Sequence, residues 1–233
     1  MKNTELAWAI LVDPKSGFMA LREQPRFWFP LLATVVSGAA VTFWYYSMVD
    51  FAWLTDHLLS GNSQADKMSE AEKAKLGTLM SKNILMWTSL AVAVIGIPLM
   101  RLLESVYYLL AGKLTGVQQS FEHWFSLSCW SAFPLLLAVV AMAVSLLIQG
   151  NGQIGLEGLQ LLSLNELLFH VPASNRWYSL LTNLTILHPW VWWLTVVGVQ
   201  VWSARSLTFC LLFALLPVVL LYGGWALIAL LIF

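Results

Sequence analysis

The chain has 233 residues, of which 59% are apolar and only 10% carry a charge, and its mean hydropathy is +0.75. Charged residues make up about a quarter of a typical soluble domain, so this composition excludes an ordinary soluble protein and indicates a membrane protein. Twelve Lys and Arg balance twelve Asp and Glu, which excludes the basic surface that nucleic-acid binding requires. We therefore expect membrane lipids, and no nucleic acid, among the partners.

Residues 1–26 form a mixed segment before the first long apolar run. Leu6, Ile10, Phe18 and Leu21 are interspersed with charged residues there, and Asp13-Pro14 interrupts the pattern because proline resets the backbone. We predict two short interfacial helices on the cytoplasmic side. They either lie on the bilayer before the chain enters it or form a docking platform for a protein partner.

Five apolar runs long enough to cross a bilayer follow this segment. We therefore predict an all-α, polytopic membrane protein in which residues 27–233 form a membrane domain of five transmembrane helices, accompanied by interfacial amphipathic helices. The expected spans cover residues 27–49, 84–111, 124–148, 186–202 and 207–233.

The Lys and Arg residues that flank the spans indicate the orientation. With the N-terminus in the cytoplasm, seven of them fall on inner segments and five on outer segments. This excess predicts a cytoplasmic N-terminus. Since five is an odd number, the C-terminus is then expected on the opposite side, periplasmic or external.

Two connections expected on the outer side carry further helical patterns. Residues 63–80 are rich in helix formers, and Ser69 and Glu72 have the spacing of a capping box. We predict a solvated helical arm there. Residues 159–169 are amphipathic, and we expect them to form a helix that lies flat on the outer surface.

One pair of charged residues, Arg101 and Glu104, lies inside an expected span. A charge at the bilayer centre costs about 2.5 to 3.5 kcal/mol on the insertion scale, so such residues are functional candidates by default. The i, i+3 spacing puts both on one helix face, where each neutralises the other. Two interpretations stay open: an ion pair that snorkels to the cytoplasmic edge, or a buried pair that locks helices together or lines a polar cavity.

Asn183 and His188 are weaker polar candidates near the outer end of the fourth expected span. His188 precedes Pro189 and follows Thr182, Asn183 and Thr185 closely, a combination that suits the start of a helix. Asn183-Leu-Thr185 also matches a glycosylation sequon, although it lies very near the membrane.

The sequence offers no pattern typical of a metal centre or an enzyme. No two of the four histidines are three to five residues apart, and both cysteines, Cys129 and Cys210, lie in apolar runs. The motifs of serine hydrolases and of zinc proteases are absent. We therefore expect no catalytic residue, no metal, no cofactor and no enzymatic activity.

Three prolines, Pro98, Pro134 and Pro217, lie inside expected spans. Each lacks an N–H and frees a carbonyl one turn upstream. The result is either kinked helices that pack against one another or, as in transporters, broken helices around a substrate site.

The order and spacing of several soft motifs resemble the bacterial branch of the Yip-domain family over nearly the whole chain. The motifs are Asp13-Pro14 with Phe18 and Leu21, Glu23-Gln-Pro25, Leu110-Ala-Gly-Lys-Leu-Thr-Gly116 with Phe121, Cys129-Trp-Ser-Ala-Phe-Pro134, Leu162-Ser-Leu-Asn165, Leu180-Leu-Thr-Asn-Leu-Thr-Ile-Leu187 with Trp190, and Val197-Gly198. The resemblance implies an integral membrane protein with a cytoplasmic N-terminus and a C-terminus on the other side. Eukaryotic members are linked to Rab GTPases and vesicle traffic, but this chain lacks their long polar N-terminal region, and the family supplies no catalytic residues.

Two functions remain open from the sequence. The first is a non-enzymatic protein of the bacterial inner membrane that organises partners or lipids, with a protein partner at the cytoplasmic N-terminal segment. The alternative is a small transporter, channel or lipid-translocating protein that uses Arg101 and Glu104. Small-residue patterns such as Ser128-x-x-x-Ala132 serve intramolecular packing and oligomer formation equally well.

Overall fold

The computed structural model describes residues 1–60, 69, 81–150 and 152–232. Within this part of the chain, the regular structure is helical, apart from one isolated bridge between Ser163 and Thr185. The expected helical arm at residues 63–80 lies outside the described residues, Ser69 excepted. The helices are α1 (Asn3–Val12), α2 (Pro14–Glu23), α3 (Trp28–Met48), α4 (Phe51–Ser60), α6 (Lys82–Ala91), η2 (Val92–Gly96), α7 (Ile97–Thr115), α8 (Phe121–Ser131), η3 (Phe133–Leu135), α9 (Leu136–Ile148), η4 (Glu157–Leu159), η5 (Asn165–Phe169), α10 (Tyr178–Asn183), α11 (His188–Ser203), α12 (Leu207–Val218), η6 (Val219–Gly223) and α13 (Gly224–Ile232).

Four helical stretches of the described chain are long and apolar enough to cross a membrane. They are Trp28–Met48, Lys82–Thr115, Phe121–Ile148 and Leu207–Leu231, and at most 28% of the most apolar window of each is buried in the protein. These four stretches agree with the first, second, third and fifth expected spans.

The fourth expected span, and with it the count of five, is not confirmed. It corresponds to α11, which has 16 residues and is therefore only about 24 Å long, against a hydrocarbon core of about 30 Å. Eight of its residues are buried, so half of this helix contacts protein. Aliphatic residues that suggest contact with lipid in the sequence form part of a protein core here.

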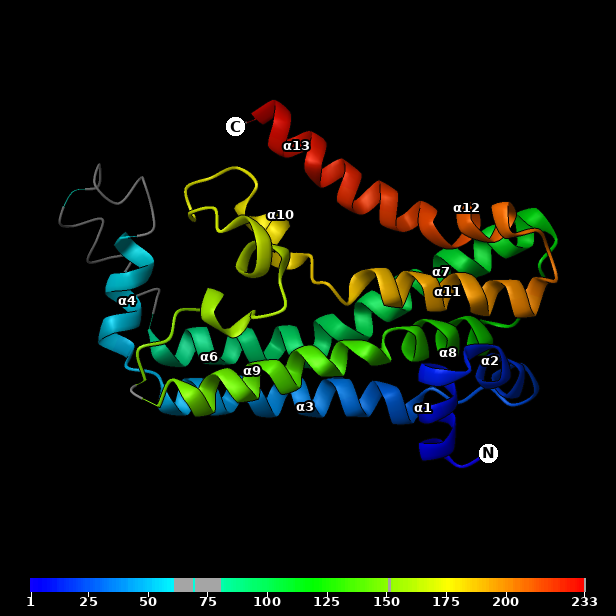
Figure 1. Ribbon diagram of the computed structural model, residues 1–233, viewed down its shortest axis with the longest axis horizontal. Helices are drawn as coiled ribbons and strands as arrows, with labels where there is room; N and C mark the ends of the chain where they lie inside the picture. The colour runs from blue at the N-terminus through cyan, green and yellow to red at the C-terminus, as the bar shows by residue number, and fades with distance from the viewer. Residues whose placement is uncertain (61–68, 70–80, 151, 233) are drawn as a thin grey trace. The chain divides into compact units, whose positions relative to one another are not determined.

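Each of the three intraspan prolines is accompanied by a local departure from α-helical geometry. Pro98 follows the π-helical turn η2, Pro134 lies in the 3₁₀ turn η3, and Pro217 precedes the π-helical turn η6. The helices nevertheless continue through these turns, as Figure 1 shows for α6 to α7, α8 to α9 and α12 to α13.

The chain divides into two compact units. The first unit comprises Met1–Val36, Ile95–Leu136 and Leu187–Trp225. Its core is rich in aromatic side chains, with Phe18, Trp124 and Trp130 fully buried. Gly198 allows α11 to approach its neighbours closely, because a Cβ atom there would lie 2.2 Å from Leu127 Cδ1 and 3.1 Å from the Phe18 ring.

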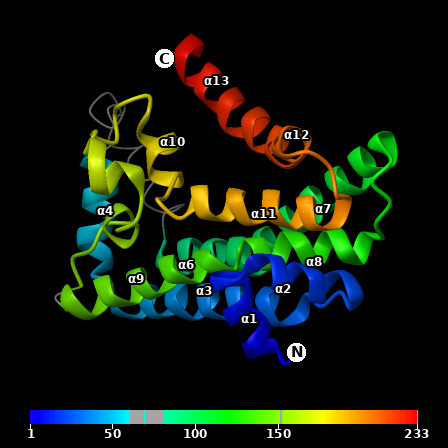
Figure 2. The ribbon, with the colours of Figure 1, turned by 45° about the vertical axis from the view of Figure 1, so that its right-hand side comes forward.

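The N-terminal segment belongs to this core. As predicted, it forms two short helices that meet at Asp13-Pro14, where the Asp13 side chain accepts a hydrogen bond from the Ser16 N–H. The apolar face of α1 packs against α2 and α8, and that of α2 packs against α8 and α11, as Figure 2 shows for α1, α2 and α8. The fully buried Phe18 accepts a 2.7 Å hydrogen bond at its carbonyl from Trp202 Nε1. These faces therefore contact protein rather than a bilayer.

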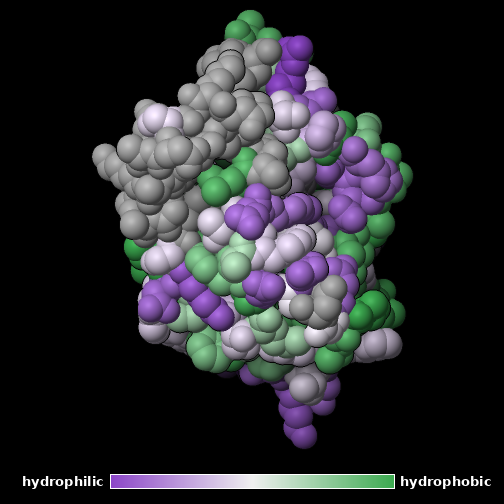
Figure 3. Space-filling view, turned by 90° about the vertical axis from the view of Figure 1, so that its left-hand side faces the viewer, coloured by the Kyte–Doolittle hydropathy of each residue, from purple (hydrophilic) through white to green (hydrophobic). Residues whose placement is uncertain are grey.

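The second unit comprises Ser37–Val94, Leu137–Ile186 and Ala226–Phe233. Two neighbouring tyrosines anchor its core: Tyr45 Oη donates to the Ile154 carbonyl at 2.9 Å, and Tyr46 Oη lies 3.1 Å from Ser89 Oγ. Polar side chains gather on the face drawn in Figure 3, next to apolar ones.

The prediction of one continuous surface helix at residues 159–169 is wrong. The structure has the short turns η4 and η5 instead, separated by the bridge at Ser163. Hydrogen bonds from the backbone N–H groups of Leu164 to the Leu184 carbonyl and of Ile186 to the Leu162 carbonyl hold this segment to a distant part of the chain. Long-range backbone pairing thus overrides the local amphipathic pattern.

Candidate functional site

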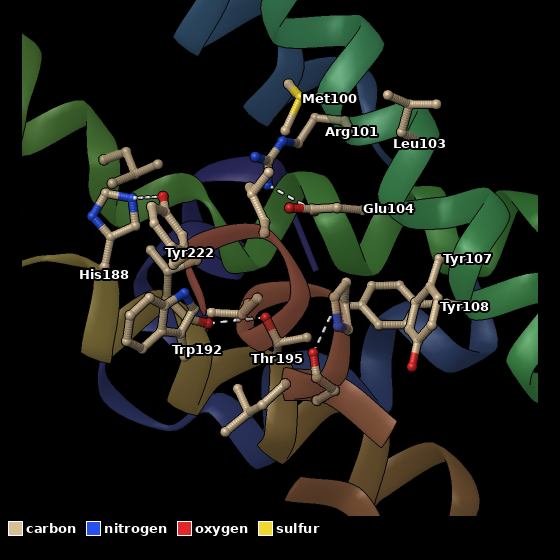
Figure 4. Close-up of a pocket in the computed structure, with 17 residues that line it drawn as sticks. Met100, Arg101, Leu103, Glu104, Tyr107, Tyr108, His188, Trp192, Thr195 and Tyr222 are labelled. Carbon is tan, nitrogen blue, oxygen red and sulfur yellow. Dashed lines mark hydrogen bonds and ion pairs between the residues drawn. The ribbon is translucent and has the colours of Figure 1, made fainter. Parts of the chain in front are cut away.

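A cavity of about 260 Å³ lies within the first unit, among the apolar helices (Figure 4). Its wall combines apolar side chains with a small number of polar groups, as ligand sites commonly do. The lining residues are Met100, Arg101, Leu103, Glu104, Tyr107 and Tyr108 from α7, Leu135 from η3, His188, Val191, Trp192 and Thr195 from α11, Ala214, Leu215, Pro217 and Val218 from α12, and Leu221 and Tyr222 from η6.

Arg101 and Glu104 form the ion pair that their spacing predicts. Arg101 Nη1 donates to Glu104 Oε2 at 3.0 Å and to the Ser128 carbonyl at 3.4 Å, while Ser128 Oγ donates to the same carboxylate oxygen. The network therefore joins α7 to α8. The side chains are 16% and 29% exposed, and Figure 4 shows both beside the cavity.

The pair also lies far from the ends of its apolar stretch. Arg101 follows Lys82 by 19 residues and precedes Thr115 by 14 within the helical stretch Lys82–Thr115. At 1.5 Å per residue, about 21 Å of helix separates it from the nearer end. The whole stretch is about 51 Å long, which exceeds a hydrocarbon core of about 30 Å, so an end of this helix does not mark an edge of the bilayer.

Two tyrosines, missed by the sequence reasoning, complete the wall next to the pair. Pro217 has no N–H and therefore leaves the carbonyl of Phe213, four residues upstream, without its helical donor. Tyr107 Oη donates to that carbonyl at 3.0 Å, and Tyr108 Oη donates to the next one, Ala214, at 3.3 Å. Their positions three and four residues after Glu104 place them on the same helix face, which is the signal that could have identified them.

An aromatic group at the start of α11 forms another part of the wall. His188 is the first residue of that helix, as its position before Pro189 suggests, and its Nε2 lies 3.2 Å from Tyr222 Oη. The Trp192 ring lies 5.8 Å from the His188 ring and 6.1 Å from the Tyr222 ring. Nothing in the sequence points to Tyr222, because 34 residues separate it from His188.

Asn183, the other weak candidate, is not brought to the cavity. It ends α10 in the second unit, and its Nδ2 donates to the Ser179 carbonyl at 2.8 Å. This is a local helix contact on an exposed side chain.

A histidine–glutamate pair, also not predicted from the sequence, lies in the second unit. His57 Nε2 is hydrogen-bonded to Glu157 Oε1, and the His57 ring stacks on Trp53 with a centroid separation of 4.7 Å. Burial raises the pKa of Tyr178 above its ordinary value, and the negative charge of Glu157 adds to this effect.

Metal-ligating side chains are not clustered in the part of the chain that the structure describes. No group of three His, Cys, Asp or Glu side chains there is close enough to hold a metal ion. Cys129 and Cys210 are buried and not joined in a disulfide. The cavity wall presents charged groups, hydrogen-bonding groups and aromatic surface.

The Yip1 domain family model matches residues 8–228, which is nearly the whole chain. The chain belongs to the Yip1 domain family. No curated protein and no solved structure matches it. The Yip1 domain and the four apolar helical stretches together establish a multi-pass membrane protein, and the match includes every residue that lines the cavity.

Proposed function

We propose that this Yip1-domain protein is a non-enzymatic membrane protein that binds and organises lipids, and that the cavity in its first unit receives a lipid headgroup. The observation that carries the proposal is the Arg101–Glu104 pair on the wall of that cavity. Charged residues within membrane helices are costly, and natural chains retain them chiefly at ligand and ion sites. The surrounding apolar helices are chemically suited to contact acyl chains.

Purification in lipid nanodiscs followed by native mass spectrometry tests this function. The wild-type chain should retain a discrete lipid, whereas Arg101→Gln should lose it. Lys113→Gln is the matched control, because Lys113 is an exposed cation on the same helix and does not line the cavity. Recovery of neither bound lipid nor a reproducible protein partner would contradict the proposed function.

The proposal includes a location in a bacterial inner membrane with a cytoplasmic N-terminus and the C-terminus on the opposite side. The Lys and Arg distribution and the resemblance to bacterial Yip-domain proteins support it. Single cysteines at the exposed positions Lys2 and Leu231, in a background without Cys129 and Cys210, test the topology with a membrane-impermeant maleimide. We expect the reagent outside the cell to label Leu231→Cys and not Lys2→Cys. Labelling of both cysteines from the same side of the membrane would show that the chain crosses it an even number of times.

A protein partner at the N-terminal segment is a further part of the proposal. The core uses the apolar faces of α1 and α2, but Trp8 and Val12 remain 69% and 62% exposed. A photo-crosslinker at Trp8 should capture a reproducible partner in cells, whereas one at the buried Leu6 should capture none.

Transport is the second candidate function, and the shape of α12 favours it. Pro217 and the π-helical turn η6 interrupt α-helical geometry where this helix lines the cavity, and interrupted helices are a feature of transporter binding sites. If the protein is a transporter, Arg101→Ala and Glu104→Ala should each abolish the flux of its substrate into liposomes, while the variants are still expressed. Unchanged flux would remove the pair from any translocation path.

A further inference from the structure

The Arg101–Glu104 pair leaves hydrogen-bonding capacity unused on both partners. Both donated bonds from Arg101 come from Nη1, and both bonds to Glu104 end on Oε2. Among the described residues, no hydrogen bond is made by Arg101 Nε or Nη2 or by Glu104 Oε1. An arginine has five N–H donors and a carboxylate accepts at both oxygens, so the same site offers free cationic donors beside a free anionic acceptor.

The charge balance of the cavity restricts the net charge of its ligand. Arg101 and Glu104 are the charged side chains among the lining residues described, and they cancel. In a medium of low dielectric constant, adding a net charge to a balanced site is costly, while a ligand with both charges preserves the balance. The cavity therefore favours a zwitterion over an anion or a cation.

The cavity volume restricts the size of the ligand. At about 260 Å³ it is slightly smaller than the 300 to 1,000 Å³ typical of pockets that enclose a drug-sized molecule. This volume suits a headgroup, with the acyl chains left along the apolar helices.

We infer that the cavity recognises the phosphoethanolamine headgroup of a zwitterionic phospholipid, with the phosphate at Arg101 and the primary ammonium at Glu104. The inference rests on the proposed lipid-binding function and names its ligand class. Planar guanidinium donors match phosphate oxygens. A primary ammonium has N–H groups to donate to Glu104 Oε1, whereas the quaternary ammonium of a choline headgroup has none.

Competition between lipids with identical acyl chains tests this assignment. The detergent-purified wild-type chain is exposed to equal amounts of phosphatidylethanolamine, phosphatidylcholine and phosphatidylglycerol, and the bound species are counted by native mass spectrometry. We expect at least a tenfold preference for phosphatidylethanolamine over each of the others, because phosphatidylcholine has no N–H to donate to Glu104 Oε1 and phosphatidylglycerol adds a net charge to the balanced site. Water-soluble glycerophosphoethanolamine, added alone, tests whether the headgroup suffices.

Two variants that each remove one charge separate the two halves of the headgroup. Glu104→Gln should abolish the preference over phosphatidylcholine and raise binding of phosphatidylglycerol, because Arg101 is then unbalanced. Arg101→Gln should lower binding of all three phospholipids about tenfold. The controls Lys113→Gln and Glu122→Gln remove exposed charges on α7 and α8 that do not line the cavity, and they should keep the wild-type ratios.

The outcomes that overturn the inference differ from those that overturn the proposed function. Lipid retention without a phosphatidylethanolamine preference, or unchanged ratios in Glu104→Gln, would overturn the headgroup assignment while lipid binding stands. No retained lipid in the wild type would overturn both. Saturation by glycerophosphoethanolamine without any lipid bound would assign the cavity to a soluble metabolite and also overturn the lipid proposal. If either variant fails to fold, the preference of the wild-type protein for phosphatidylethanolamine still tests the headgroup assignment.

Discussion

Each of the two units contains a glutamate that is hydrogen-bonded to a basic side chain, and the two pairs differ in how exposed they are. In the first unit, Arg101 and Glu104 are 16% and 29% exposed, and Ser128 adds further hydrogen bonds from α8. In the second unit, the side chains of His57 and Glu157 are 38% and 34% exposed. The strength of such a pair depends on its surroundings, so the two side chains of the first pair should be energetically coupled and those of the second nearly independent.

Removal of one partner of the first pair should have the largest effect. Arg101→Ala leaves the Glu104 carboxylate without its cation in a largely apolar wall. Glu104→Ala leaves the Arg101 guanidinium without its anion in the same wall. Since the pair is partly exposed, we expect each to lower the free energy of unfolding by about 2 to 4 kcal/mol, at or below the range for fully buried pairs. The double variant should be more stable than either single variant. Titration with SDS in mixed micelles measures these energies, and additive effects would show that the two side chains are not coupled.

Close packing around α11 in the first unit should produce the next largest effect. Gly198→Ala adds a Cβ atom 2.2 Å from Leu127 Cδ1 and 3.1 Å from the Phe18 ring, and both residues are fully buried. Overpacking of this kind costs about 1 to 3 kcal/mol. Gly224→Ala is the matched control, because a Cβ there meets nothing within 4 Å. Equal stability of the two variants would show that the core around Gly198 accommodates an added methyl group as easily as an exposed helix does.

Features of the fold that depend on neighbouring residues were predictable from the sequence. The break at Asp13-Pro14, the shared face of Arg101 and Glu104, and the start of α11 at His188 all follow from local rules. The structure confirms the helix break, the ion pair and the first residue of α11.

Features that depend on tertiary packing could not be predicted. His57 and Glu157 are 100 residues apart, and His188 and Tyr222 are 34 apart, so no spacing rule connects them. The burial of α11 was missed for a different reason. Apolar side chains of the same composition face lipid in one helix and protein in another, and hydropathy does not distinguish these environments.

The tyrosines of α7 should show a moderate effect that depends on Pro217. Tyr107→Phe leaves the Phe213 carbonyl without a donor, which should cost about 1 kcal/mol. In a Pro217→Ala background the restored N–H of residue 217 can bond to that carbonyl, so the same substitution should cost measurably less. A double-mutant cycle followed by unfolding gives the coupling energy. A coupling of zero would mean that the hydroxyl does not substitute for the missing helical donor.

The second pair should show the smallest coupling. His57→Ala and Glu157→Ala each remove other contacts, including the stacking of His57 on Trp53, so only the cycle with the double variant isolates the pair. Exposed ion pairs contribute about 0.2 to 1 kcal/mol. With His57 protonated, so that the contact is an ion pair, we expect a value in that range that falls further in 1 M salt, where the screening length is about 3 Å. The coupling of Arg101 with Glu104 should change much less in the same salt, because partly buried charges are screened less. Equal salt sensitivity of the two couplings would mean that the cavity wall is as accessible to water and ions as the surface of the second unit.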